Sequence, residues 1–117
     1  MCIRDRSEDF HELVEQLAGV ERIDSARWST FKVRGQTFGY LGEATQTVGL
    51  KQTLSEQLAL VAERPDTFEI QFTAGQFGWV VVYLARVDRR ELAELTYEAW
   101  RLTAPAGLVE ASSGLPR

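Results

Sequence analysis

Short runs of alternating apolar and polar residues, separated by turns of only a few residues, constrain the fold of this chain most. Phe31 and Val33 alternate with polar neighbours, residues 34–36 predict a tight turn, and Phe38 and Tyr40 then share one face. This pattern is typical of a β-hairpin. Connections this short join antiparallel strands, since parallel strands need a crossover of about a dozen residues or more. The sequence therefore predicts an antiparallel sheet.

Three amphipathic helices are predicted beside this sheet, because apolar residues recur at helical spacing after residues that suit a helix N-cap. Residues 53–56 (Thr-Leu-Ser-Glu) and 88–91 (Asp-Arg-Arg-Glu) form capping boxes, and Pro65 and Pro105 end the helices that follow. The predicted helices cover residues 8–18, 54–64 and 89–102. The predicted strands cover residues 30–34, 37–41, 46–51, 67–72 and 79–84.

The same pattern predicts which side chains face the core. The second helix is expected to turn an apolar stripe toward the sheet, formed by Leu54, Leu58 and Val61. The strand at residues 67–72 is expected to place its apolar residues on one face, namely Phe68, Ile70 and Phe72. Gly39 lies inside a predicted strand and indicates a bulge or the close approach of another backbone.

These elements predict one α+β domain in the order α-β-β-β-α-β-β-α. The expected architecture is a two-layer sandwich, an antiparallel sheet of about five strands with the helices on one face. The chain has 117 residues, and we expect the domain to cover residues 7–110, followed by a frayed tail at residues 111–117. Residues 1–6, MCIRDR, match the translated end of a transposase-derived sequencing adapter and are expected to be an artefact.

The composition excludes several classes of protein. Lys and Arg number 13 against 17 Asp and Glu, a net charge of −4, which excludes a uniformly basic nucleic-acid coat but leaves room for a basic strip. With one His and one Cys and no phosphate-loop spacing, we expect a non-enzymatic protein without metal or cofactor. No apolar run reaches the ~18–20 residues of a membrane span. No signal peptide is visible either, which favours a cytoplasmic protein.

The local exception in charge lies between Arg22 and Arg34, where four basic residues accompany one acidic residue, Asp24. Lys32 and Arg34 are expected to share the outer face of one strand, and Lys51 ends a predicted neighbouring strand. Such a hairpin is suited to contact the phosphates of double-stranded DNA, or it is a solvated outer strand whose charges prevent aggregation. The candidate nucleic-acid-binding residues are Arg22, Arg27, Lys32, Arg34 and Lys51.

Two tryptophans also stand out from the pattern. Trp28 lies at the entry to the hairpin, and Trp79 opens the most hydrophobic strand. The expected role of both is packing in the core or at a sheet edge. The alternative is a platform on which nucleic-acid bases stack.

Several blocks of sequence occur in a characteristic order: FHELVEQLAGVE, FKVRGQTFGYL, VGLKQTLSEQ, ERPDTF, GWVVVYL, VDRRELAEL and EAWRLTAP. In these blocks the chain resembles the MmcQ/YjbR family of small bacterial proteins over almost all of residues 7–110. The resemblance implies a two-layer α+β fold similar to those of secretion chaperones and frataxin. The family carries the label "DNA-binding protein", and it supplies no catalytic residues to transfer to this chain.

Two functions are therefore expected from the sequence. The first is DNA binding by a small non-enzymatic protein through a basic β-hairpin that contacts phosphates. The alternative is a protein-interaction or self-association module without a nucleic-acid role, which would use the outer sheet face or an edge strand.

Overall fold

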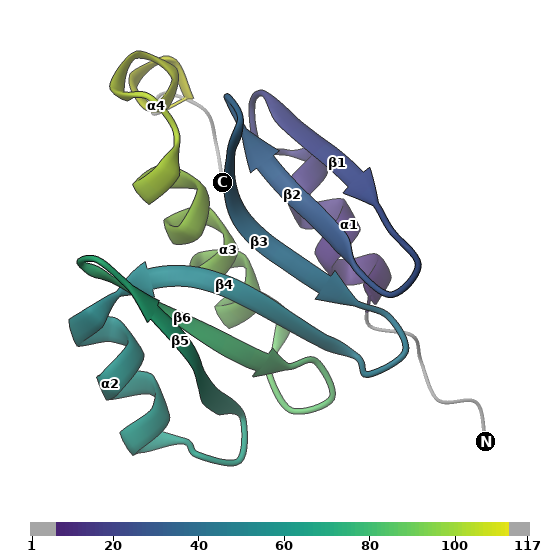
Figure 1. The fold of residues 1–117 in the computed structure, drawn as a ribbon, viewed down its shortest axis with the longest axis vertical. Helices are drawn as coiled ribbons and strands as arrows, with labels where there is room; N and C mark the ends of the chain where they lie inside the picture. Colours follow the sequence, from purple (N-terminus) through teal and green to yellow (C-terminus); the bar gives the residue numbers. More distant parts are fainter. Residues whose placement is uncertain (1–6, 113–117) are drawn as a thin grey trace.

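The computed structural model describes residues 7–112, whose elements are labelled in Figure 1. The elements are α1 (Ser7–Glu15), β1 (Val20–Asp24), β2 (Ser29–Val33), β3 (Gln36–Gly42), β4 (Thr47–Thr53), α2 (Leu54–Glu63), β5 (Phe68–Ala74), β6 (Phe77–Tyr83), α3 (Arg89–Thr103) and α4 (Ala106–Ser112). All the predicted helices and strands are present. The adapter-like residues 1–6 and most of the predicted tail lie outside the described residues.

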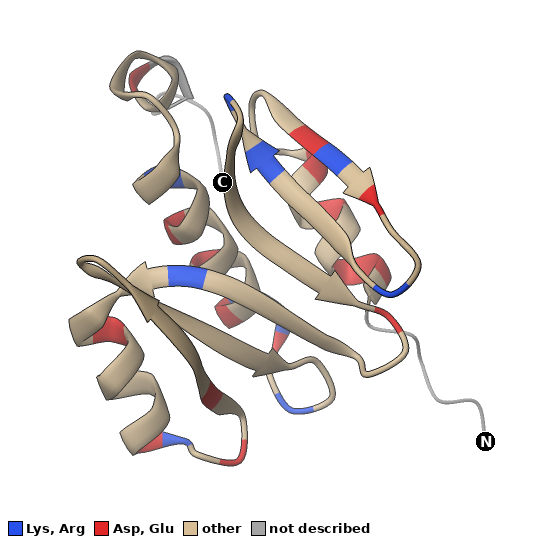
Figure 2. Ribbon diagram, in the orientation of Figure 1, with Lys and Arg blue, Asp and Glu red and all other residues tan. Residues whose placement is uncertain are grey.

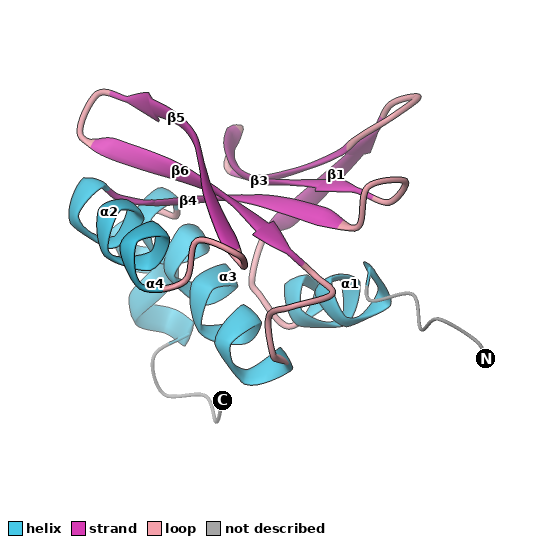
Figure 3. Ribbon diagram, turned by 90° about the horizontal axis from the view of Figure 1, so that it is seen from below, coloured by secondary structure: helices cyan, strands magenta, loops and turns pink. Residues whose placement is uncertain are grey.

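The strands form one sheet in the order β1-β2-β3-β4-β6-β5, and every neighbouring pair is antiparallel. Figure 3 shows the sheet edge-on, with the helices together below it and none of the described helices above it. The predicted two-layer α+β sandwich is therefore confirmed. We refer to the sheet surface that the helices leave uncovered as the open face.

The sheet has six strands rather than about five, because β1 was not predicted. Only Val20 and Ile23 are apolar among its five residues, so the alternation that marks the other strands is weak here. β1 is an edge strand with most of its residues exposed, and it pairs with β2 along its whole length. Its strand conformation comes from this pairing rather than from burial of its side chains.

The turn between β2 and β3 has left-handed backbone at both central positions, with φ of 52° at Arg34 and 80° at Gly35. Such turns match the natural twist of a hairpin. Arg34 was expected to share a strand face with Lys32, but it lies in this turn, beyond the end of β2. The bulge predicted near Gly39 is confirmed, since the β2–β3 register shifts between Phe31 and Lys32.

The hydrophobic core lies between the sheet and the helices. Phe10 of α1 meets Phe31 of β2 edge to face, with ring centroids 5.1 Å apart. Trp100 of α3 is fully buried, and its indole Nε1 donates a hydrogen bond to the carbonyl of Ala18, 2.9 Å away. These contacts join α1, α3 and the sheet, and they fix which sheet surface is covered.

Both predicted capping boxes form their N-cap hydrogen bonds. The apolar stripe expected on α2 is wrong for Leu54 and Leu58, whereas Val61 packs against the core as expected. Leu58 is 59% exposed, and Leu54 is also exposed. Gln57 points inward instead and is buried against Gly78, whose lack of a side chain makes the space for it. Its amide satisfies two backbone carbonyls of the sheet, a requirement that an apolar side chain at this position would not meet.

The C-terminal helix α4 was also not predicted, because Pro105 and Gly107 indicated a stop. The proline carbonyl instead accepts hydrogen bonds from the amides of Leu108 and Val109 and begins a new short helix. Both side chains pack against the core cluster. Tertiary packing therefore outweighs the low intrinsic helix propensity of this segment.

Candidate functional site

The five predicted basic residues do not gather on one surface. In Figure 2 the basic segment on β4 lies well apart from those on β1 and β2, and the basic segment on β1 is flanked by acidic ones. Arg27 lies in the turn before β2 and Arg34 in the turn after it, at opposite ends of that strand. Lys32 and Lys51 lie on β2 and β4, two strands apart.

Strand alternation places Lys32 and Lys51 on the open face. Lys32 stands between Phe31 and Val33, which are both buried on the helix side. Lys51 is likewise flanked by residues that face the helices, as Gln52 donates a hydrogen bond to the carbonyl of Leu95 in α3 at 3.1 Å. The structure thus brings these two predicted residues to a common surface.

Arg22 lies on the opposite side of the sheet and is already engaged. It pairs in register with Phe31, so its side chain leaves β1 on the helix side. Its Nε donates to a carboxylate oxygen of Asp24 at 2.8 Å. This hydrogen bond is the main reason that the pKa of Asp24 lies below its ordinary value, with a second contribution from the hydroxyl of Ser29. Arg22 is therefore a poor candidate for binding phosphate from the open face.

Lys32 and Lys51 differ in their surroundings. Lys32 stands opposite Glu21 in the β1–β2 register, so part of its charge is balanced across the strands. The Nζ of Lys51 lies 4.1 Å from the ring centroid of Phe77, in cation–π geometry. Partial burial lowers the pKa of Lys51. The ring of Phe77 holds the ammonium group of Lys51 in place, so Lys51 presents its positive charge at a fixed position.

The open face also carries an aromatic cluster built around Trp79. Phe72 of β5 stacks on Trp79 of β6 with ring centroids 5.2 Å apart and planes 17° apart. The ring of Tyr40 on β3 is tilted against the indole of Trp79, with ring centroids 5.4 Å apart. Trp79 is consequently only 6% exposed although it lies on the uncovered side of the sheet.

Phe72 reaches this cluster because of a bulge, which overturns the expectation that Phe68, Ile70 and Phe72 share one face. The β5–β6 register shifts between Ile70 and Phe72. Phe68 stays in the core, whereas Phe72 pairs with Trp79 and lies on the open face. A single extra residue reverses the face of all that follows. The simple alternation in the sequence gave no sign of this reversal.

A shallow cavity of about 290 Å³ lies next to the cluster on the open face, between the β1–β2 turn and β5. Trp28 and Phe72 both line it. They are 46% and 40% exposed, respectively. The complete lining consists of Ser25, Trp28, Thr30, Tyr40, Gln71 and Phe72. Of these only Trp28 was named from the sequence as a candidate stacking residue, because the others are brought together by strand order and the bulge.

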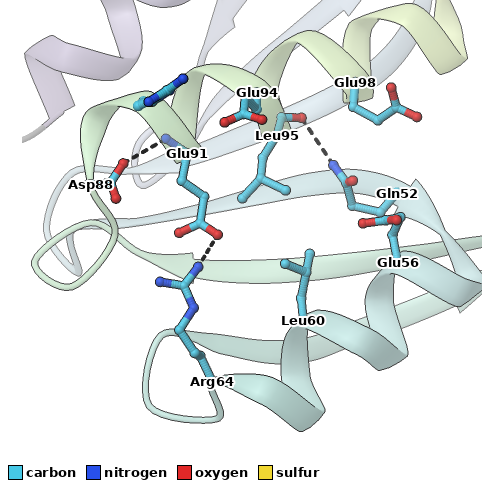
Figure 4. A pocket seen from close by; sticks show the side chains of 10 residues that line it. Gln52, Glu56, Leu60, Arg64, Asp88, Glu91, Glu94, Leu95 and Glu98 are labelled. Atoms are coloured by element: carbon cyan, nitrogen blue, oxygen red, sulfur yellow. Dashed lines mark hydrogen bonds and ion pairs between the residues drawn. The ribbon is translucent and has the colours of Figure 1, made fainter.

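A second cleft, of about 600 Å³, lies between α2 and α3 on the helix side (Figure 4). Its lining is rich in carboxylates, with Glu91 hydrogen-bonded to Arg64 across the cleft. Within residues 7–112, acidic, His and Cys side chains form no group of three or more with the arrangement of a metal site. The acidic cleft is therefore a surface that would repel a polyanion, on the side opposite to Lys32 and Lys51.

Comparisons with known proteins agree with this fold. The sequence model of the YjbR family matches residues 8–102. The crystal structure of the Deinococcus radiodurans protein DR2400, described as containing a DUF419 domain, superposes with a TM-score of 0.76 at 17% identity. The match covers 94% of this chain and 88% of that protein. No curated protein matches the sequence. Among the described residues, no helix is long and apolar enough to span a membrane.

The family match covers most of the chain, and its limits enclose the complete sheet together with α2 and nearly all of α1 and α3. The order of helices and strands agrees with the resemblance inferred from the sequence blocks. The chain therefore belongs to the YjbR family.

Proposed function

We propose that this chain is a non-enzymatic cytoplasmic protein that binds nucleic acid through the open face of its sheet. Lys32 and Lys51 are the phosphate-contacting residues on that face, and Arg27 and Arg34 extend the contact at its rim. This differs from the hypothesis drawn from the sequence in three respects. The contact surface is the open face rather than the hairpin alone, the ligand is nucleic acid in general rather than double-stranded DNA, and Arg22, which lies on the helix side, takes no part.

The separation of charge between the two layers carries this proposal. Helices α1, α2 and α3 contain nine acidic residues against three basic ones. The open face carries Lys32 and Lys51 with Glu21 and Glu69, and its rim adds the two arginines. A polyanion would be repelled from the helix layer and approach the sheet layer. Approach from the side of the sheet layer supports phosphate contact even though the net charge of the whole chain is negative.

The test is an anisotropy titration of labelled single-stranded and duplex oligonucleotides at low and moderate salt. Wild-type affinity should fall steeply with salt, because phosphate contacts release counterions. In Lys32→Gln/Lys51→Gln the slope of log K against log salt should be smaller by about 2, one for each lost contact. Arg22→Gln is the matched control, since it removes a charge from the other face and should leave the slope unchanged.

Two results would contradict the proposal. One is the absence of oligonucleotide binding by the wild type at low salt. The other is an equal loss of affinity in Arg22→Gln and in the single variant Lys32→Gln, which would mean that only the overall charge matters.

A second candidate function, self-association, is favoured by an apolar surface at the β5 edge of the sheet. Leu54 and Leu58 lie on the flank of α2 that points away from α3, and Ile70 on β5 is 51% exposed. β5 is also an edge strand with a single charged residue, and such edges pair readily with another chain. Sedimentation velocity distinguishes this candidate: it requires a dimer in the wild type and a monomer in Leu58→Glu.

A further inference from the structure

We propose that the cavity between Trp28 and Phe72 receives an unpaired nucleobase, so that the ligand is a single strand rather than a duplex. This inference rests on the proposed nucleic-acid function and specifies its ligand class. Bases of a duplex are stacked on one another and present only their edges in the grooves. An exposed aromatic ring therefore gains a stacking partner only from an unpaired base.

Both aromatic walls are already held in place. A Cβ on Gly42 would lie 2.9 Å from Cζ3 of Trp28, so the indole lies directly on the glycine backbone. The carbonyl of Trp28 accepts hydrogen bonds from the amide and the hydroxyl of Ser25, at 2.8 and 3.0 Å. Phe72 is supported from below by the stacked ring of Trp79. A base that enters therefore meets two preformed surfaces, which keeps the entropic cost of binding low.

The polar part of the lining matches the edge of a base. Thr30 offers a hydroxyl, Tyr40 offers a phenol, and Gln71 offers both a donor and an acceptor. The amide of Gln71 lies over Gly49, where a Cβ would be only 2.4 Å from its Oε1. A purely apolar ligand would cover these groups without satisfying them. A flat heterocycle with polar edges fits both the rings and the polar groups.

Size and charge agree with one base as the occupant. The cavity of about 290 Å³ is at the lower limit of typical ligand pockets, roughly 300 Å³. Lys32 and Lys51 share the open face with the cavity, one on either side of β3. A strand whose base enters the cavity thus has positive charges available for the adjoining phosphates.

The experiment compares three ligands of equal length: oligo(dT), the corresponding abasic strand, and a mixed-sequence duplex. The abasic strand keeps every phosphate but has no bases. Wild-type protein should bind oligo(dT) at least about five-fold more tightly than the abasic strand, as expected for one stacked base. Tryptophan fluorescence, to which the exposed Trp28 contributes, should be quenched by oligo(dT) and not by the other two ligands.

Variants then assign the preference to the cavity. Trp28→Ala and Phe72→Ala should each lose the preference for oligo(dT) while keeping the affinity for the abasic strand. Trp28→Phe should retain part of the preference for oligo(dT), because a smaller aromatic ring remains. Ile23→Ala is the matched control, because Ile23 is similarly exposed at 50% but does not line the cavity. Thermal melting of each variant confirms that it is folded.

The outcomes separate this inference from the proposed function. Equal wild-type affinity for oligo(dT) and the abasic strand overturns the base site and leaves phosphate binding intact. No binding of either strand at low salt overturns both. A preference that survives in both alanine variants also overturns the base site. So does displacement of bound oligo(dT) by a tryptophan-containing peptide at comparable concentration, which would assign the cavity to a protein partner.

Discussion

Replacing Gln57 by Met tests how the buried amide positions the aromatic cluster. The Nε2 of Gln57 donates to the carbonyl of Trp79 at 2.8 Å and to that of Phe72 at 3.1 Å, where the bulge interrupts the β5–β6 ladder. Methionine has a similar length and volume but no donor. The variant therefore removes both hydrogen bonds without leaving a large cavity, and the packing against Gly78 changes little.

The size of the effect follows from the burial of the two carbonyls. An unsatisfied buried acceptor costs about 1–3 kcal/mol. The Trp79 contact is buried and takes the full cost, whereas the Phe72 contact is half-buried and water can replace part of it. The apolar methionine offsets about 1 kcal/mol of the total. We expect the free energy of unfolding to fall by about 1–3 kcal/mol, and the melting temperature by roughly 4–12 °C for a domain of this size.

Differential scanning calorimetry and urea denaturation measure both quantities, and near-UV circular dichroism reports the environment of Trp79. The near-UV signal should weaken, because the backbone of Phe72 loses the hydrogen bond from Gln57 and its ring then stacks less firmly on Trp79. Gln36→Met is the control, since Gln36 is exposed at the start of β3 and its loss should change stability by less than about 0.5 kcal/mol. A Gln57→Met protein that melts within 2 °C of wild type would refute the reasoning.

Three further predictions concern single hydrogen bonds. The hydrogen bond from Arg22 lowers the pKa of Asp24 in the folded state. The stability that Asp24 contributes is therefore complete above its unfolded pKa of 3.8, and it is lost as the pH falls through the lower folded pKa. The stability advantage of the wild type over Asp24→Asn should therefore shrink in acid, and an NMR titration of the carboxyl should give a pKa below 3.8. The hydroxyl of Tyr83 donates to Glu69 at 2.5 Å, and this hydrogen bond raises the pKa of Tyr83. The stability that Tyr83 contributes should therefore be lost as the pH rises above 10 through the folded pKa. A Tyr83→Phe protein should lack this alkaline loss of stability in urea denaturation. Thr53→Ala removes the N-cap of α2 and should cost about 1 kcal/mol by urea denaturation, whereas Thr53→Ser should cost almost nothing.

Local chemistry explains the parts of the fold that the sequence predicts well. The capping threonine and aspartate begin α2 and α3 where expected, as their side chains accept hydrogen bonds from amides three residues on. The turn after β2 was placed correctly, and Gly35 there adopts a positive φ. These features depend on neighbours within a few residues, so a single sequence contains the information. β1 was missed because its pairing partner, not its own residues, stabilises it.

The candidate site was predicted only in part. Lys32 and Lys51 were named from the sequence, and the structure brings them to one face. Arg22 was named as well, but the register with Phe31 turns it to the other side, where Asp24 binds it. The positions of these residues in the chain could not show which of them share a face, because neighbouring residues on a strand point in opposite directions.

The sequence by itself determined the α+β class, the antiparallel sheet, the ends of the main helices and the membership in a family, since periodicity and capping chemistry act locally. The tertiary structure decided which side chains the open face displays. A bulge moves Phe72 from the core side to the open side, and Gln57, distant in the chain, supplies the hydrogen bonds that keep it there. Shifting a strand by one residue exchanges its faces, and only contacts between distant segments specify where that shift occurs.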